Sequence, residues 1–384
     1  MKIELNHSSN EESNLFLRCF YSRLREHYGK CAWFFMPSKN SANTTIRIGT
    51  VDIGIEDHNQ DVTIKYSKKG VIKELFMNNP FSPNTKALDD ELYEVATSLD
   101  TTKLTKYFVS SIIEIPYISI ANVNADGFYI FPDSNNRTRI AITVSAFDPY
   151  DAAYLFGSLI NEVCNFLSIC LNTYVKSGQI FIGRDLHVDT KNELYSGDED
   201  WIDDHPMVNG SMALSEDQVS MVIDIIAGNV KPEFLTACAH FNNAVYLLKD
   251  HSLNQNFLVD AATVLYVSSL EVCSSLFNYN RSSCSECGQV KYSIRKRVLD
   301  LVGKYHPEHL KKFIDKYYQG RSKYLHAGSH SSSGNYYGVS IPQLDPDSDS
   351  GCHAQASSHP INLRDFTSYI FRKVSKEREL TRCC

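Results

Sequence analysis

The residues best suited to chemistry lie in one short stretch, YYQGRSKYLHAG, at positions 317–328. Arg321 is a permanent cation whose planar fork fits a phosphate group, and His326 can accept and donate a proton near neutral pH. Such a pair can cleave RNA without a metal, because a base deprotonates the 2′-hydroxyl while the cation holds the phosphate. Five residues on a regular helix place the two side chains about 140° apart. They therefore converge only if the helix frays at Ala327–Gly328, if Arg321 reaches round, or if a second subunit contributes its own pair.

The spacing alone favours a simpler interpretation, in which Arg321 is a surface residue and His326 interacts with the last carbonyls of a helix. The wider motif favours the catalytic interpretation, in which both residues act on RNA. Arg321-Ser-Lys-Tyr-Leu-His326, followed by Ala-Gly, resembles the R-x4-6-H signature of the HEPN superfamily, and its RSK-x-x-H form is most similar to the ApeA-like HEPN group. An upstream helix that carries Ser269-Leu270-Glu271 in an apolar run also fits. The resemblance covers roughly residues 230–380, and the N-terminal part is placed in no family.

The resemblance implies an all-α HEPN-like helical bundle that acts as a metal-independent endoribonuclease. Its substrate would be single-stranded or tRNA-like RNA, and it would act as a homodimer. Its setting would be antiphage defence or a toxin-like abortive infection, with a phage-derived trigger. Arg321 and His326 would be catalytic, and Ser322, one helical turn before His326, would orient the imidazole or contact phosphate. Active members often carry Asn, Asp or His where Ser322 stands. That difference favours an alternative, a catalytically inactive HEPN module that binds RNA or protein, or mediates dimerisation, and regulates a partner. A third hypothesis gives the main function to the N-terminal domain.

Two further features surround the motif. Glu271 is the charge that stands out in an apolar helix, and it lies either at an exposed edge or paired, as a buried carboxylate, with Arg321 or His326. The run 290–326 is the only strongly basic segment of the chain. It is either two amphipathic helices with solvated lysines or an electrostatic funnel for RNA, with tyrosines that stack on bases. The candidate RNA-binding residues are Lys311, Lys312, Lys316, Tyr317, Tyr318, Lys323 and Tyr324.

A cysteine pair upstream of the motif has metal-ligand spacing. Cys284-Ser-Glu-Cys287-Gly288 is half of a zinc knuckle, because two thiolates at this spacing can chelate one tetrahedral ion. Cys352 and His353 can supply the other half. We therefore expect a structural zinc and no cofactor for catalysis. The alternative is that these residues are unpaired thiols.

Composition sets limits on the class of protein. A chain of 384 residues with 43% apolar and 22% charged residues, among them 22 Tyr and 20 Phe, predicts a globular protein of two domains. A net charge of −7 gives no overall basic field, so an RNA site must be a local patch. We expect no signal peptide and no apolar run near the roughly 20 residues that span a membrane. The protein should therefore be cytoplasmic, and its 11 cysteines free thiols or metal ligands rather than disulfides.

The elements that position the motif follow from hydrophobic periodicity. Residues 14–36 and 152–175 have helical patterns, and residues 44–57, 61–69, 107–120, 127–133 and 139–147 are strand-like, with a turn at Asp133–Arg137. These elements predict an α+β N-terminal domain, with antiparallel strands plus helices, over residues 1–182. Residues 183–214 predict an acidic linker, in which the cluster around Glu199 and Asp200 is a solvated loop rather than a metal site.

From residue 215 the pattern changes to helices. Ser215 and Gln218 form a predicted capping box, and Pro232 suits a first helical turn. The run 256–277 is apolar nearly all round, as in a central buried helix. Residues 215–384 are therefore predicted to form the all-α HEPN-like domain.

Overall fold

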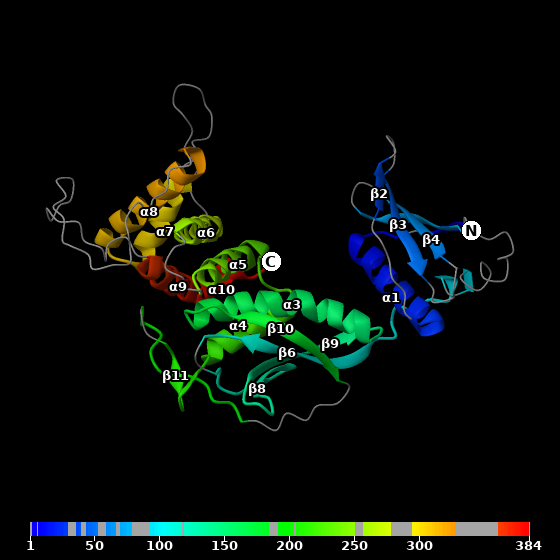
Figure 1. The fold of residues 1–384 in the computed structure, drawn as a ribbon, viewed down its shortest axis with the longest axis horizontal. Coiled ribbons are helices and arrows are strands. Elements are labelled where there is room, and N and C mark those ends of the chain that lie inside the picture. Colours follow the sequence, from blue (N-terminus) through cyan, green and yellow to red (C-terminus); the bar gives the residue numbers. More distant parts are fainter. Residues whose placement is uncertain are drawn as a thin grey trace. The chain divides into compact units, whose positions relative to one another are not determined.

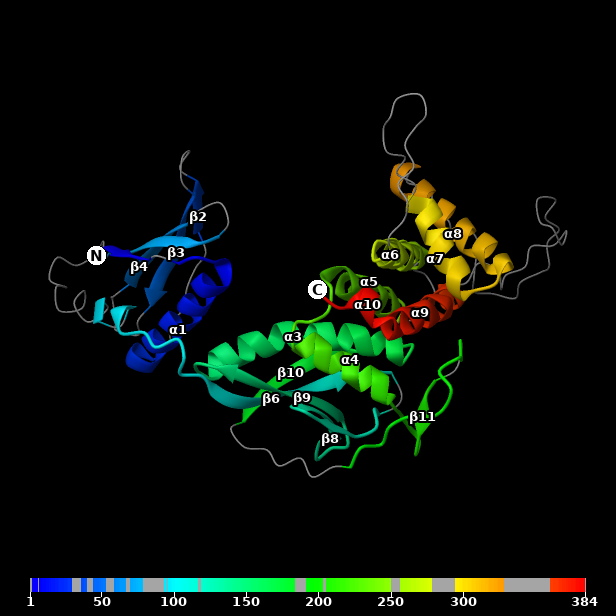
Figure 2. The same cartoon turned by 180° about the vertical axis from the view of Figure 1, so that it is seen from behind.

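The computed structural model describes residues 2–5, 7–29, 36–39, 44–52, 59–66, 70–78, 93–94, 96–116, 119–183, 191–202, 205–249, 256–277, 294–327 and 360–383. Backbone contacts divide the chain into two compact units. Unit 1 comprises residues 1–107, 144–155 and 182–184, and unit 2 comprises residues 108–143, 156–181 and 185–384. The fold combines antiparallel sheets with helices (Figures 1 and 2). The predicted α+β class is confirmed at this level.

Unit 1 is built on a five-stranded sheet in the order β1-β5-β4-β3-β2, in which each neighbouring pair is antiparallel. The elements are β1 (Lys2–Glu4), α1 (Asn10–Tyr28), β2 (Met36–Lys39), β3 (Thr44–Asp52), β4 (Asn59–Tyr66) and β5 (Ile72–Asn78). The predicted strands at 44–57 and 61–69 correspond to β3 and β4.

Helix α1 begins where its first amides find a side-chain acceptor. The Ser9 hydroxyl accepts a hydrogen bond from the Glu12 amide at 3.1 Å, as a helix N-cap does. Phe16, Phe20 and Leu24 then recur every four residues and are buried against the sheet in one core cluster. The helix therefore covers the sheet with one apolar stripe and leaves its other face for polar contacts.

Unit 2 contains a second sheet, in the order β10-β6-β9-β8-β7, and a long helix. Its elements are β6 (Thr105–Glu114), β7 (Val123–Ala125), β8 (Phe128–Pro132), β9 (Thr138–Ala146), α3 (Pro149–Cys170) and β10 (Lys176–Gly183). The first residues of β6 and α3 and the last residues of β9 and β10 are assigned to unit 1. At the turn between β8 and β9, Asp133 accepts hydrogen bonds from the Asn135 and Arg137 amides, so the predicted hairpin tip is confirmed.

The remaining elements of unit 2 are a short hairpin and a series of helices. They are β11 (Met207–Val208), β12 (Ser211–Met212), α4 (Glu216–Ile226), α5 (Pro232–Leu247), α6 (Asn256–Ser274), α7 (Ile294–Tyr305), α8 (Glu308–Ala327), α9 (Pro360–Lys376) and α10 (Arg378–Thr381). The Ser215–Gln218 capping box is present, and Pro232 occupies the first turn of α5. Helix α6 packs against α5, α7, α8 and α9, which confirms it as a central helix.

The contacts group the second sheet with the C-terminal helices in unit 2, whereas the sequence predicts an acidic linker between two domains over 183–214. Helix α3 lies between the sheet and helices α5 and α9 (Figures 1 and 2). Buried polar contacts join the two parts: the Asn172 amide donates to Asp365 at 2.7 Å, and the Ser368 hydroxyl donates to the Ile169 carbonyl at 2.8 Å. These pairs are about 200 residues apart in sequence, a separation at which hydrophobic periodicity carries no information.

The acidic segment before β11 is also packed, contrary to the prediction of a solvated loop. Glu199 is buried, and Lys376 pairs with its carboxylate at 3.0 Å. Arg372 of α9 is 1% exposed and donates to the carbonyls of Glu199 at 2.8 Å and Trp201 at 2.6 Å. Its guanidinium also lies 3.3 Å from the centre of the Trp201 ring. This segment is therefore fixed to α9 rather than a free linker.

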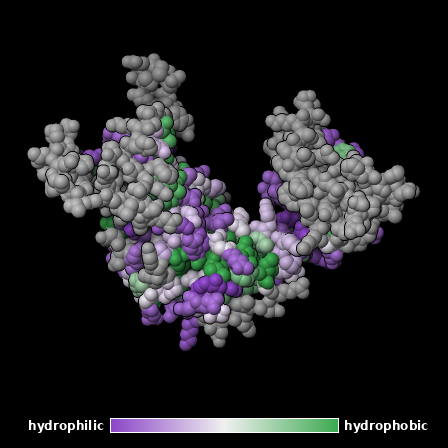
Figure 3. Space-filling model, in the orientation of Figure 1, coloured by the Kyte–Doolittle hydropathy of each residue, from purple (hydrophilic) through white to green (hydrophobic). Residues whose placement is uncertain are grey.

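Helix α3 differs from the expectation that the chain has no apolar run long enough to span a membrane. By length and composition it could cross a membrane, although half of its most apolar stretch is buried inside the protein. The core helix of a soluble protein passes the same test, and Phe156, Ile160 and Val163 of α3 are fully or almost fully buried. Figure 3 shows hydrophobic residues at the surface in the region of α3 and β10, where Ile180 is exposed.

Candidate functional site

The motif helix α8 runs without interruption from Glu308 to Ala327. Positions 321 and 326 therefore lie on one regular helix, about 140° apart around its axis, and the helix does not end before Ala327. Fraying at Ala327–Gly328 involves Gly328, which lies outside the described residues, and it stays a prediction, as do the reach of Arg321 and a second subunit. The side chains of Lys323 and His326 lie outside the described part of the structure.

Arg321 forms an ion pair with Glu271 of α6. Its Nη2 lies 2.8 Å from Oε2 of Glu271, and the two side chains are 21% and 15% exposed. Of the two interpretations of Glu271, the paired carboxylate is therefore the one observed, with Arg321 as its partner. The pair joins the helix that carries the R-x4-H motif to the helix that carries Ser269-Leu270-Glu271.

Tyr318 completes this cluster. It lies one helical turn before Arg321, its ring centre is 5.9 Å from the Arg321 guanidinium carbon, and its hydroxyl hydrogen-bonds to Glu271. Burial, followed by this hydrogen bond and the Glu271 charge, raises the pKa of Tyr318. The sequence predicts a base-stacking role for Tyr318 and does not predict this contact. The i, i+3 spacing from Arg321 is the signal that could have suggested it.

The hydrogen bonding of the cluster is incomplete. Arg321 Nε and Glu271 Oε1 are both buried and have no hydrogen-bond partner among the described residues. Arg321 carries five N–H donors in a fixed fork, and its Nε–H is a donor that no described residue uses. Buried polar atoms without partners are uncommon and call for a functional or structural reason. The arrangement holds a guanidinium in place and leaves part of it unbound.

Ser322 and the candidate RNA-binding residues have varied environments. Ser322 is half-buried and lies on the same face of α8 as position 326. Lys312 and Lys316 are exposed, whereas Lys311 pairs with Glu308 at 3.0 Å. Tyr317, Tyr318 and Tyr324 are half-buried, and the Tyr317 ring packs edge-on against Phe313.

The positive charge of the basic segment is partly neutralised. Arg295 of α7 makes a two-point ion pair with Asp315 of α8, at 2.7 and 2.6 Å. Lys304 pairs with Glu377 at 2.6 Å. The segment is therefore less electropositive than its sequence suggests, and the exposed Lys312 and Lys316 are its best-placed cations for an RNA backbone.

The predicted zinc ligands Cys284, Cys287, Cys352 and His353 all lie outside the described residues. Within the part of the chain that the structure describes, no group of three His, Cys, Asp or Glu side chains could hold a metal ion. Six described cysteines are free thiols, and five of them are buried. Burial raises the pKa of Cys164 to about 12, which keeps this thiol protonated and unreactive at neutral pH.

Comparisons of the chain with protein-family models, curated proteins and solved structures found no match.

Proposed function

We propose that this protein is a metal-independent endoribonuclease of the HEPN type that cleaves RNA as a homodimer. The observation that supports this most is the ion pair between Arg321 and Glu271. It brings together the two segments on which the resemblance to HEPN domains rests, from helices α6 and α8. A guanidinium that is anchored by a carboxylate and keeps free donors suits the stabilisation of a charged phosphate.

In the proposed reaction His326 removes the proton of a 2′-hydroxyl, and the 2′-oxygen attacks the adjacent phosphorus. The bond from phosphorus to the 5′-oxygen breaks, and the leaving oxygen takes up a proton. The products are a 2′,3′-cyclic phosphate and a 5′-hydroxyl. Arg321, held by Glu271, stabilises the charge on the phosphorane oxygens. Ser322 orients the imidazole or contacts phosphate.

A homodimer supplies what one chain lacks. A single R-x4-H pair offers one base and no evident acid for the leaving oxygen, and its two positions diverge around α8. Two motif helices related by a two-fold axis would bring a second Arg321 and His326 to the same RNA. Sedimentation should therefore show a dimer at micromolar concentration. A monomer that still cleaves RNA would contradict this part of the proposal.

The proposal also includes RNA binding by α8, a structural zinc and a cellular role. Lys312 and Lys316, with the other basic and tyrosine residues of α8, bind single-stranded or tRNA-like RNA. A structural zinc on Cys284, Cys287, Cys352 and His353 supports the fold and takes no part in the chemistry. The protein works in the cytoplasm in antiphage defence, and the N-terminal region responds to a phage-derived trigger.

The test is cleavage of total RNA by purified protein in EDTA, with wild type compared with His326→Ala and Arg321→Ala. Each substitution should reduce cleavage by about 10²–10⁴-fold. Both should be similarly severe, because groups that act as a unit are not additive. His309→Ala, at an exposed position of the same helix, is the matched histidine control. Arg295→Ala, which also removes an ion pair, is the arginine control. Full activity of His326→Ala would end the nuclease assignment.

A second candidate function is a non-catalytic HEPN module that binds RNA or protein and regulates a partner. The Arg321–Glu271 pair also supports this reading, because its carboxylate already neutralises the arginine. Ser322, at a position where active members often carry other residues, points the same way. In this case wild type and His326→Ala would bind RNA equally and neither would cleave it.

A further inference from the structure

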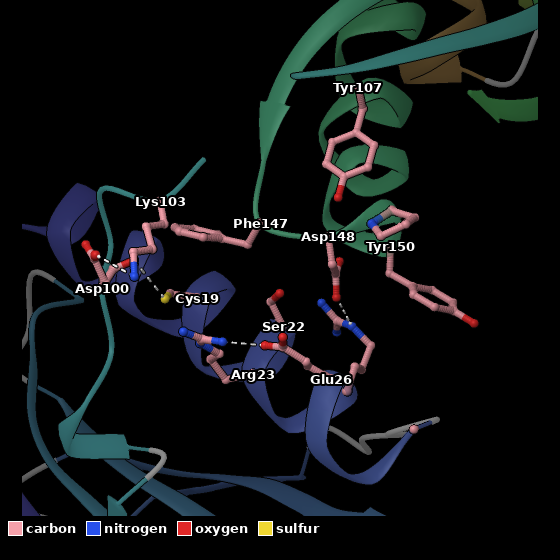
Figure 4. Close-up of a pocket in the computed structure, with 13 residues that line it drawn as sticks. Cys19, Ser22, Arg23, Glu26, Asp100, Lys103, Tyr107, Phe147, Asp148 and Tyr150 are labelled. Carbon is pink, nitrogen blue, oxygen red and sulfur yellow. Dashed lines mark hydrogen bonds and ion pairs between the residues drawn. The ribbon is translucent and has the colours of Figure 1, made fainter. Parts of the chain in front are cut away.

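Unit 1 contains a cavity of about 530 Å³, which is lined by none of the residues of the motif helix. Its walls are α1, the start of β6 and the corner where β9 leads into α3 (Figure 4). The lining combines the aromatic rings of Tyr107, Phe147 and Tyr150 with the cations of Arg23 and Lys103. Cavities of this size commonly hold small organic ligands. The charges and hydrogen bonds of the lining residues indicate which kind of ligand this cavity would bind.

Two of the three carboxylates that line the cavity, those of Asp148 and Asp100, are already engaged in the fold. Asp148 accepts a hydrogen bond from the Asp151 amide at 2.7 Å, which caps α3, and another from Arg25 Nε at 2.6 Å. Asp100 accepts from the Thr102 amide at 3.0 Å and from the Thr102 hydroxyl, and these bonds lower the pKa of Asp100. Neither carboxylate needs a ligand.

The cations, in contrast, are loosely held. Arg23 pairs with Glu26 only across the exposed surface of α1, where the two side chains are 42% and 68% exposed. Lys103 is 74% exposed and lies 3.6 Å from Asp100. Exposed pairs of this kind contribute little. An incoming anion can therefore take over both cations while water solvates the released carboxylates.

The hydroxyls of two largely buried residues, Ser22 and Tyr107, point to the same conclusion. Ser22 is 7% exposed and Tyr107 is 4% exposed, yet neither hydroxyl is hydrogen-bonded within the described part of the chain. Figure 4 shows Tyr107 directed from its strand towards α1, from which Ser22 faces the same space. Neither hydroxyl is among the fully buried polar atoms that lack a partner, so both are open to the cavity and can bind a ligand there.

We propose that this cavity binds a nucleoside monophosphate. Arg23, Lys103 and the two hydroxyls would hold the phosphate, since together they offer a guanidinium fork, an ammonium and two neutral donors. The ring of Phe147 would pack against the planar base. This site is separate from the proposed nuclease site, and binding to it can be measured without any cleavage of RNA.

Isothermal titration calorimetry of the full-length protein with AMP, GMP, CMP and UMP tests the proposal. At least one should bind with a Kd on the order of 10 µM, as the usual efficiency of ligands of this size implies. Arg23→Ala and Lys103→Ala should each raise the Kd at least about 10-fold, and Tyr107→Phe about fivefold. The matched control is Arg137→Ala, which removes an arginine of similar exposure and also paired with a carboxylate, but in unit 2.

Three results would overturn the proposal. The first is the absence of measurable binding of all four nucleotides by wild type. The second is binding that Arg23→Ala and Lys103→Ala weaken no more than Arg137→Ala does. The third is binding of inorganic phosphate, or of the uncharged nucleoside, as tight as that of the nucleotide. Equal binding of phosphate would show that the base is not recognised, and equal binding of the nucleoside would show that the phosphate is not. Arg23 and Lys103 are exposed enough that their removal should leave unfolding curves unchanged, which separates lost binding from lost folding.

Discussion

The ion pair between Arg321 and Glu271 can be tested as a structural element by a double-mutant cycle. At 2.8 Å and an effective dielectric constant of about 20, the gross attraction between two unit charges is about 6 kcal/mol. Desolvation offsets much of it, and the 21% and 15% exposure of the side chains reduces it further. We expect Glu271→Ala to destabilise unit 2 by about 2–4 kcal/mol, because a half-buried guanidinium is left without its partner.

The double variant Glu271→Ala/Arg321→Ala should be less unstable than the sum of the single variants, by about 1–3 kcal/mol. Urea unfolding of the full-length chain measures this, and each unit is to be followed separately because two units can unfold in two transitions. The control cycle uses Arg295 and Asp315, a pair in which the arginine is 52% exposed and the expected coupling is below about 1 kcal/mol. A coupling for Arg321 and Glu271 no larger than that of the control would refute the view that Glu271 holds the guanidinium.

Three further predictions follow from other parts of the molecule. Arg372→Met should lower the free energy of unfolding, measured in urea, by about 3–5 kcal/mol, because the carbonyls of Glu199 and Trp201 lose a charged donor. A loss below about 1 kcal/mol would contradict the view that Arg372 fixes this segment to α9. Burial lowers the pKa of His306 below 6.5. As the pH falls, the imidazole is therefore protonated in the unfolded chain before it is protonated in the folded one, and the free energy of unfolding should decrease below about pH 6.5. His306→Gln should make the unfolding free energy less dependent on pH, and an unchanged pH profile would count against this. Elemental analysis should find about one zinc per chain, reduced in Cys284→Ser; folded, metal-free wild-type protein would exclude zinc.

Local signals in the sequence identified local structure well. The capping box at Ser215 and Gln218, the first-turn Pro232 and the turn at Asp133–Arg137 each depend on residues a few positions apart, and all three are present. Glu271 was also informative, because a lone carboxylate in an apolar helix needs a partner. The position of Arg321 on a neighbouring helix made it a candidate for that partner.

Long-range packing is what the sequence could not supply. The acidic composition around Glu199 predicts a solvated loop, and only Arg372 and Lys376, more than 170 residues later, explain why this residue is buried. The cavity in unit 1 was missed for the same reason, since Arg23 and Lys103 belong to segments with no shared periodicity. Hydroxyls such as that of Tyr107 reveal a site only when their missing partners can be counted in three dimensions.

The buried hydrogen bonds that join the end of α3 to α9 have a practical consequence for experiments on truncated forms of this protein. A fragment that begins at residue 215 would contain the whole motif helix but would lack Asn172 and the Ile169 carbonyl, which leaves Asp365 and Ser368 of α9 without their buried partners. It would also lack Phe166, against which Phe234 of α5 packs. Such a fragment should aggregate or unfold, and a loss of activity in it would say nothing about the N-terminal residues as regulators. Point substitutions in the intact chain, rather than truncations, are the way to assign roles to its two units.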